Sequence, residues 1–164
     1  MGKRHMPLNA GFMNCTVKGD DIGIPMNNIL GGQERYGFGW HMFVECLAEG
    51  EDVSLPAGSA GCGRSIVSAI RAYSRVWKQF RVPIAKFGGI QEALSLAGSD
   101  ALIIIAGTDL MNSLVNNHEA PMVISSIMKQ NCMERGRRIV EHGMDIAGRA
   151  AICRGEKTLL GMPT

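Results

Sequence analysis

Acidic side chains gather between positions 45 and 52, where a catalytic base would have other carboxylates close by. The cluster consists of Glu45, Glu49, Glu51 and Asp52, and Ser54 follows it at a position that suits a helix N-cap. Negative charge just before a helix stabilises the positive end of the helix dipole by about 0.3–1 kcal/mol. A catalytic base also needs a pocket and a partner. The sequence therefore favours a structural role for this cluster.

Glycine and small residues run through Gly58–Arg64, a composition that phosphate-binding loops share. A dinucleotide-binding loop follows a strand, whereas these glycines fall on a helical stripe, so we expect close helix packing instead. His41 and His118 are solitary, and the five cysteines form no Cys-x-x-Cys pair. No metal site and no disulfide framework is predicted, and we expect buried free thiols.

The chain has 164 residues and a net charge of +2, which suits one domain, or part of a larger protein, without a polyanion-binding field. Nucleic acid is therefore not an expected partner. The longest apolar run, from Ala101 to Gly107, is far shorter than the roughly 20 residues of a membrane-spanning helix. The basic start, Met1 to His5, is not followed by an apolar signal core. We expect a cytoplasmic protein with no transmembrane segment.

Two regions differ in their pattern. Residues 1–33 mix short apolar runs with Asn, Gly, Asp and Pro, which predicts strands at 11–17 and 21–25 in a β or irregular arm. Residues 34–164 have helical periodicity, with helices predicted at 37–48, 54–80, 88–115 and 120–147. Short connections favour antiparallel neighbours. The predicted fold is mainly α, an antiparallel helical bundle with a short N-terminal arm.

Each predicted helix has an apolar stripe that should face the core. The stripes are Trp40, Phe43, Val44 and Leu47; then Leu55, Cys62, Ile66, Ile70, Tyr73, Trp77 and Phe80; then Ile90, Leu94, Ala97, Ala101, Ile104, Ile105, Met111 and Leu114; and finally Ile124, Met128, Cys132, Ile139, Gly143 and Ala147. The arginines at 135, 137 and 138 are expected on a solvated face, paired along their own helix.

Several ordered segments resemble the acyl-CoA dehydrogenases, the flavoenzymes of fatty-acid β-oxidation, and above all their large bacterial members. The corner "KQFRVPIAKFGGIQEAL" (Lys78 to Leu94) and the helix "MERGRRIVEHGMDIAG" (Met133 to Gly148) resemble that family's C-terminal helical domain. The segments "KRHMPLNAGFMN", "IPMNNILGG" and "GFGWHMFVECL" resemble the end of its middle β-domain and the helix that follows. The resemblance implies that residues 1–33 are a remnant of that β-domain and that 34–164 form the C-terminal bundle.

What the resemblance implies for function is an FAD-dependent oxidoreductase that acts on fatty acyl-CoA. In that family the C-terminal bundle contacts the flavin of a partner subunit, so the chain is expected to form a homo-oligomer or to pair with related subunits. The acyl-CoA contact falls near Gly50 and Glu51, and Glu49 or Glu51 is a weak candidate for the catalytic base. The implied flavin positions are Trp77, Lys78, Gln79, Phe87, Gly88, Asp145, Gly148 and Arg149.

The chain departs from the family pattern at several of these positions. Trp77 stands where the family has arginine, Arg81 where it has glycine, and Gly88 where it has glutamine or glutamate. Arg149 and the alanines after it replace glycines that let the backbone approach the cofactor. The usual catalytic glutamate would lie beyond Thr164. These departures predict weakened or lost FAD binding.

Two hypotheses follow from these observations. In the first, the chain is a fragment or truncated relative of an acyl-CoA dehydrogenase that is inactive alone. In the second, it is a non-catalytic helical module for oligomerisation or interaction, which exposed apolar surface would favour. Whether the chain is an enzyme is left open by both.

Overall fold

The computed structural model describes residues 15–119 and 122–152; the side chains at 48–52 and 122 lie outside that description. The chain divides into two compact units, Met1–Met42 and Phe43–Thr164, and each is described by itself. The fold is mainly helical, as the periodicity predicts.

The first unit carries two short 3₁₀ helices, η2 (Met26–Asn28) and η3 (Gln33–Arg35), and the first residues of helix α1. Its backbone turns at Gly31, Gly32 and Gly37, which have φ values of 81°, 81° and 87°. The prediction of a strand at 21–25 is wrong: no strand occurs from residue 15 to 42, and residues 11–14 lie outside the described range. A single short strand has no neighbour to complete its hydrogen bonds. The predicted boundary at residue 33 stays a prediction.

Helix α1 (Gly39–Val76) is continuous over 38 residues, so the prediction of two separate helices is wrong. Pro56 lies inside α1 and is almost fully buried. Proline removes one backbone hydrogen bond from a helix, and burial of its apolar ring offsets part of that loss. Ser54 is therefore not an N-cap, and the charge at 51–52 does not precede a helix.

The corner after α1 is a small antiparallel hairpin. Strands β1 (Lys78–Gln79) and β2 (Val82–Pro83) pair Gln79 with Val82, and the 3₁₀ helix η4 (Ile84–Lys86) leads into α2 (Gly88–Asn116). The Ile84 N–H donates to the Trp77 carbonyl at 2.9 Å, which ties the two sides of the hairpin together. Helix α1 therefore ends at Val76 rather than near Phe80, and the predicted turn between the helices is confirmed.

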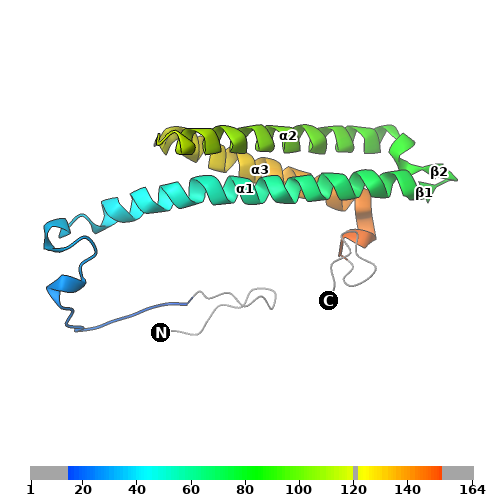
Figure 1. Cartoon of the computed structure of the whole chain (residues 1–164). Helices are drawn as coiled ribbons and strands as arrows, with labels where there is room; N and C mark the ends of the chain where they lie inside the picture. The colour runs from blue at the N-terminus through cyan, green and yellow to red at the C-terminus, as the bar shows by residue number, and fades with distance from the viewer. Residues whose placement is uncertain (1–14, 120–121, 153–164) are drawn as a thin grey trace. The chain divides into compact units, whose positions relative to one another are not determined.

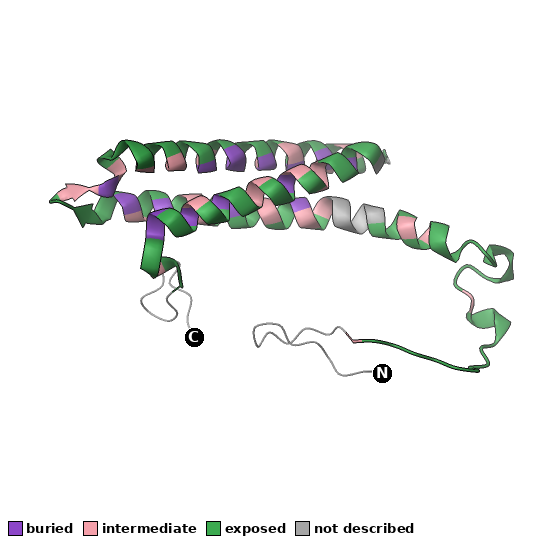
Figure 2. Ribbon diagram, turned by 180° about the vertical axis from the view of Figure 1, so that it is seen from behind, coloured by how far each residue is buried: buried purple, intermediate pink, exposed green. Residues whose placement is uncertain are grey.

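Helix α3 (Met122–Ala147) follows α2 and ends in the 3₁₀ helix η5 (Gly148–Ile152). Figure 1 shows α2 running back beside α1, with α3 alongside both. The buried residues lie on the sides of these helices that face one another (Figure 2). One core cluster contains residues from all three helices and from η4: Ile70, Ile84, Ala97, Ala101, Ile104, Cys132, Ile139 and Ile146.

The stripes of the last two helices predicted most of this core. The stripes around α1 predicted some core residues that are in fact exposed. Ala97, Ala101 and Ile104 are buried as predicted. Trp40 and Phe80 are not core residues, because 77% and 90% of their surfaces are exposed. Trp40 lies near the start of α1, and Phe80 lies in the hairpin turn beyond the end of α1.

Two glycines let the helices approach closely. A Cβ atom at Gly143 of α3 would lie 2.7 Å from Cγ2 of Ile66 on α1, and one at Gly63 of α1 would lie 3.1 Å from Cδ1 of Ile139 on α3. Gly63 belongs to the glycine-rich segment, and its contact agrees with helix packing rather than phosphate binding. The absence of a Cβ atom at these two glycines therefore lets α1 and α3 pack at this distance.

We expect Gly143→Ala to destabilise the fold and Gly98→Ala to stabilise it. The first forces Ile66 or the two helices to move, at a cost of about 1–3 kcal/mol in the free energy of unfolding. The second adds a Cβ atom with nothing within 4 Å and gains about 0.5–1 kcal/mol, because glycine is a poor helix former. Urea denaturation of both variants measures the difference, and equal effects of the two substitutions would contradict this packing.

Candidate functional site

The strongest polar feature of the core is an ion cluster between α2 and α3. Asp100 of α2 is only 7% exposed. Arg138 of α3 donates two hydrogen bonds to the Asp100 carboxylate, from Nε to Oδ2 at 3.0 Å and from Nη2 to Oδ1 at 2.9 Å. Arg135 donates from Nη1 to Oδ1 at 2.6 Å. Two guanidinium groups thus share one carboxylate, which fixes the register of α2 against α3.

This cluster corrects the prediction of a fully solvated arginine face. Arg135 and Arg138 reach across to another helix, whereas Arg137 pairs with Glu134 at 3.1 Å and with Glu141 on its own exposed helix face. The hydrogen bond that Arg137 donates to Glu134, followed by the charges of Glu141 and Glu134, raises the pKa of Arg137 further above its ordinary value. A pattern along one helix does not indicate a pair of residues that lie 35 or 38 positions apart. The one signal in the sequence was Asp100, an acidic residue within the apolar stripe of its helix.

We expect Asp100→Ala to lower the free energy of unfolding by about 1.5–3 kcal/mol, because it leaves two arginines without their shared carboxylate. The partial exposure of both arginines lets water replace some of that interaction. Asp109→Ala removes an exposed carboxylate from the same helix and should change stability by about 0.5 kcal/mol or less. Thermal and urea unfolding compare the two, and similar losses would rule out a special role for Asp100.

The residues predicted to contact a flavin fall on two segments. Trp77, Lys78 and Gln79 form the start of the hairpin, where the Trp77 ring stacks on Tyr73 with a centroid distance of 5.8 Å. Phe87 is the N-cap of α2 and Gly88 its first residue. All five residues therefore belong to one corner.

The other predicted positions lie elsewhere. Asp145 is near the end of α3, and Gly148 and Arg149 begin η5, with φ of 54° at Gly148. Gly50 and the candidate bases Glu49 and Glu51 lie on the backbone of α1, but their side chains are outside the description. FAD and acyl-CoA binding at these positions stays a prediction.

Two hollows accompany the three helices. A groove of about 250 Å³ runs between α1 and α3 and has a mainly apolar lining: Ile66, Ala69, Ile70, Val140, Gly143, Met144, Ala147 and Ala151. A more polar hollow of about 240 Å³ between α1 and α2 includes Arg64, Thr108 and Asp109. Within the described ranges, no group of three or more His, Cys, Asp or Glu side chains is arranged to hold a metal ion.

The outer face of α2 carries a regular stripe that sequence reasoning missed. Three large apolar residues, each about half exposed, recur every seven residues, and a small exposed residue follows each of them three positions later. We call this stripe the α2 seam: Leu96, Ser99, Ile103, Ala106, Leu110 and Ser113. Alternate spacings of three and four residues are the signal of a helix-packing seam, and they were hidden because α2 is apolar on both faces.

Helix α2 is also long enough and apolar enough, by length and composition, to cross a membrane, and 39% of its most apolar window is buried inside the fold. It is the one such helix in the described part of the chain. The buried helix of a soluble bundle passes the same test. The expectations of no transmembrane segment and of a cytoplasmic location therefore stay predictions.

The cysteines differ in their surroundings. Cys132 is buried in the core, whereas Cys46 and Cys62 are exposed and Cys15 is intermediate. The prediction of buried thiols therefore holds for Cys132 but not for Cys46 or Cys62, and Cys153 lies outside the described residues. Burial raises the pKa of the Cys132 thiol, and the positive charge of Arg135 opposes this rise.

We expect iodoacetamide to modify Cys132 at least about tenfold more slowly than Cys62 in the folded chain. The raised pKa lowers the thiolate fraction at any given pH, and burial blocks access of the reagent. Peptide mass spectrometry after timed labelling measures the two rates. The difference should vanish in denaturant, and fast labelling of Cys132 in the native chain would place it outside the core.

The chain is similar to a known protein over part of its length. No family model and no solved structure matches the chain. The chain is similar to Protein HemX of Proteus mirabilis, with 43% identity over 72 residues. These residues are 44% of this chain and 42% of HemX, so the chain spans less than half the length of that relative.

This similarity overturns the acyl-CoA dehydrogenase interpretation. The matched relative is HemX, not an acyl-CoA dehydrogenase. The predictions of a truncated FAD-dependent dehydrogenase, a flavoprotein and a role in β-oxidation are therefore wrong. The segments behind that interpretation are a proline and glycine corner and amphipathic stripes, and similar local physics produces them in unrelated helical proteins.

Proposed function

We propose that the chain is a helical assembly module in which the α2 seam binds the same seam of a second copy. The observation that carries the proposal is the exposure of the large seam residues, with 49%, 46% and 50% of Leu96, Ile103 and Leu110 exposed. Burial of such side chains against a partner helix contributes about 25 cal/mol for each Å² of apolar surface. A helix face with heptad spacing favours another helix as its partner.

The order of residues along the seam supports a second copy in antiparallel orientation. When two seams are aligned in opposite directions about their midpoint, Leu96 meets Ser113 and Leu110 meets Ser99, while Ile103 meets Ala106. Every large side chain then packs on a small one, which lets the two backbones approach closely. In a parallel pair in register, large residues would meet large and small would meet small. A twofold interface uses one patch on both copies, as this pattern requires.

The polar groups of the seam are already satisfied. The Ser99 hydroxyl donates to the Ser95 carbonyl at 2.8 Å, and the Ser113 hydroxyl donates to the Asp109 carbonyl at 2.8 Å. Burial of these serines therefore leaves no hydroxyl without an acceptor, which removes the main cost of burying them. The same alignment places Glu92 opposite Asn117, so no like charges face each other at the seam ends.

The similarity to HemX supplies no reaction or ligand to this proposal, because it covers less than half of either chain. The core polar cluster of Asp100 with its two arginines supports rigidity of the α2 and α3 pair. A rigid helix pair presents the seam in one fixed orientation, which lowers the entropy lost on association.

We expect the exchange of Ile103 and Ala106 to separate this interface from other modes of association. Ala106→Ile alone brings isoleucine against isoleucine, and Ile103→Ala alone leaves two voids, so each should weaken the dimer by about tenfold or more. The double variant I103A/A106I restores every large-on-small pair and should restore the dimer. Size-exclusion chromatography with light scattering over a concentration series measures the three variants.

Val123→Ala is the matched control, because Val123 is 73% exposed and lies on α3, outside the seam. This variant should keep the affinity of the wild-type dimer. A wild-type chain that stays monomeric at high concentration would overturn the proposed function. A double variant as weak as the single variants would overturn the antiparallel alignment.

A further inference from the structure

Positive charge is concentrated around the corner between α1 and α2. From Val53 to Gln91 the chain has six cationic residues and no acidic one, although its overall charge is only +2. Five of these cations lie near or in the hairpin and are exposed. We call them the corner cations: Arg71, Arg75, Lys78, Arg81 and Lys86. Among the described residues, none of them has an acidic partner.

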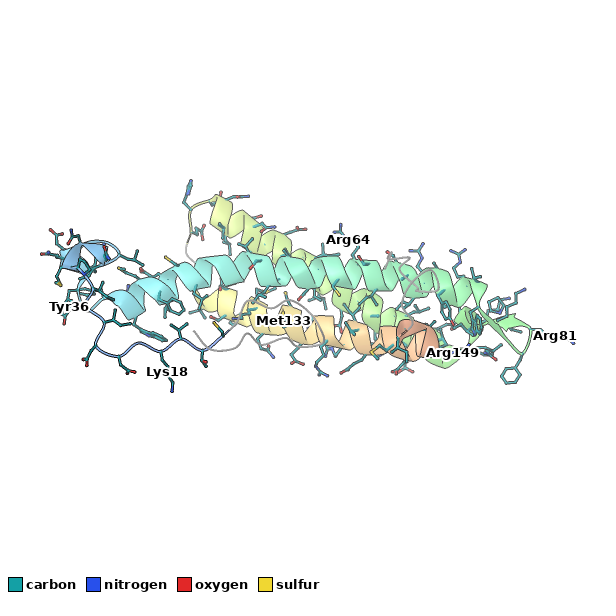
Figure 3. The ribbon with its side chains drawn as sticks, turned by 90° about the horizontal axis from the view of Figure 1, so that it is seen from below. Lys18, Tyr36, Arg64, Arg81, Met133 and Arg149 are labelled. Atoms are coloured by element: carbon teal, nitrogen blue, oxygen red, sulfur yellow. The ribbon has the colours of Figure 1, made fainter. Side chains whose placement is uncertain are left out.

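Large apolar side chains are exposed among these cations. Phe80 is 90% exposed and Val76 is 79% exposed, while Trp77 and Phe87 are 46% and 37% exposed. Figure 1 shows the hairpin extending past the end of α1, and Figure 3 shows Arg81 at its far end. The corner is therefore a projecting apolar tip surrounded by positive charge.

The backbone holds this tip in an unfavourable conformation. Phe80 and Arg81 are the two turn residues of the hairpin, with φ values of 50° and 65°. Two-residue hairpin turns with positive φ at both positions normally use Asn and Gly, because a side chain is strained there. Strained residues of this kind occur often at binding sites. Here an aromatic residue and a cationic residue occupy the two turn positions at the apex.

The combination of groups matches an anionic lipid surface. Aromatic side chains insert at the level of the lipid headgroups, and lysine and arginine are attracted to anionic headgroups. A single-stranded nucleic acid needs several aromatic rings along one groove. In this corner the Trp77 ring is stacked on Tyr73, and Phe80, at 90%, is the most exposed aromatic side chain. We propose that the corner binds the surface of anionic lipid membranes, with Phe80 inserted and the corner cations on the headgroups.

The test is sedimentation of the full chain with vesicles of phosphatidylcholine, with and without phosphatidylserine. The wild-type chain should bind the anionic vesicles, and added salt should weaken the binding. The double variant K78Q/R81Q should bind about 25-fold more weakly, since each cation near such a surface contributes about fivefold. Arg137→Gln removes an exposed cation on α3, away from the corner, and serves as the control with wild-type binding.

Phe80→Gly separates loss of binding from loss of fold. Glycine relieves the positive φ at this position, so the variant should unfold at the same or a higher temperature. It should nevertheless bind anionic vesicles several-fold more weakly, because the inserted ring is gone. Equal binding to neutral vesicles, or unchanged binding of the corner variants, would overturn the proposal. Binding of single-stranded DNA at the corner without binding of vesicles would also overturn it.

Discussion

The arrangement of the three long helices depends on how closely α1 and α3 approach each other. Gly63 and Gly143 lie where these helices meet, and a side chain on either would press on Ile139 or Ile66. Packing at this distance buries Ile70 of α1 with Ile139 and Ile146 of α3 in one core. The core in turn fixes which face of each helix points outward, and so determines every exposed surface of this unit.

The polar groups of the core fix the register in which α2 packs against α3. A purely apolar contact between α2 and α3 would tolerate sliding by one helical turn, because apolar stripes repeat at that spacing. The carboxylate of Asp100, bound by Arg135 and Arg138, allows one register. A fixed register matters for both proposed surfaces, since the outer face of α2 and the corner at its start are presented by the same rigid helix.

The sequence predicted the later helices better than the first one. Periodic stripes placed 88–115 and 120–147 within a few residues of α2 and α3, because both helices have a continuous buried face. Pro56 suggested a helix start, yet it lies inside α1, where burial of its ring offsets part of the cost of one lost hydrogen bond. The family interpretation failed because it relied on short segments whose residues follow from helix and turn physics.

The sequence by itself determined the helical class, the turn at Pro83, the buried faces of α2 and α3 and the absence of acidic residues from 53 to 91. These are properties of neighbouring residues, which local sterics and periodicity control. Only the tertiary structure decided that Phe80 is exposed and that Arg138 binds Asp100 across two helices. It also decided which apolar face of α2 stays open. These outcomes depend on which helix packs where, and contacts between distant residues leave no periodic trace in the sequence.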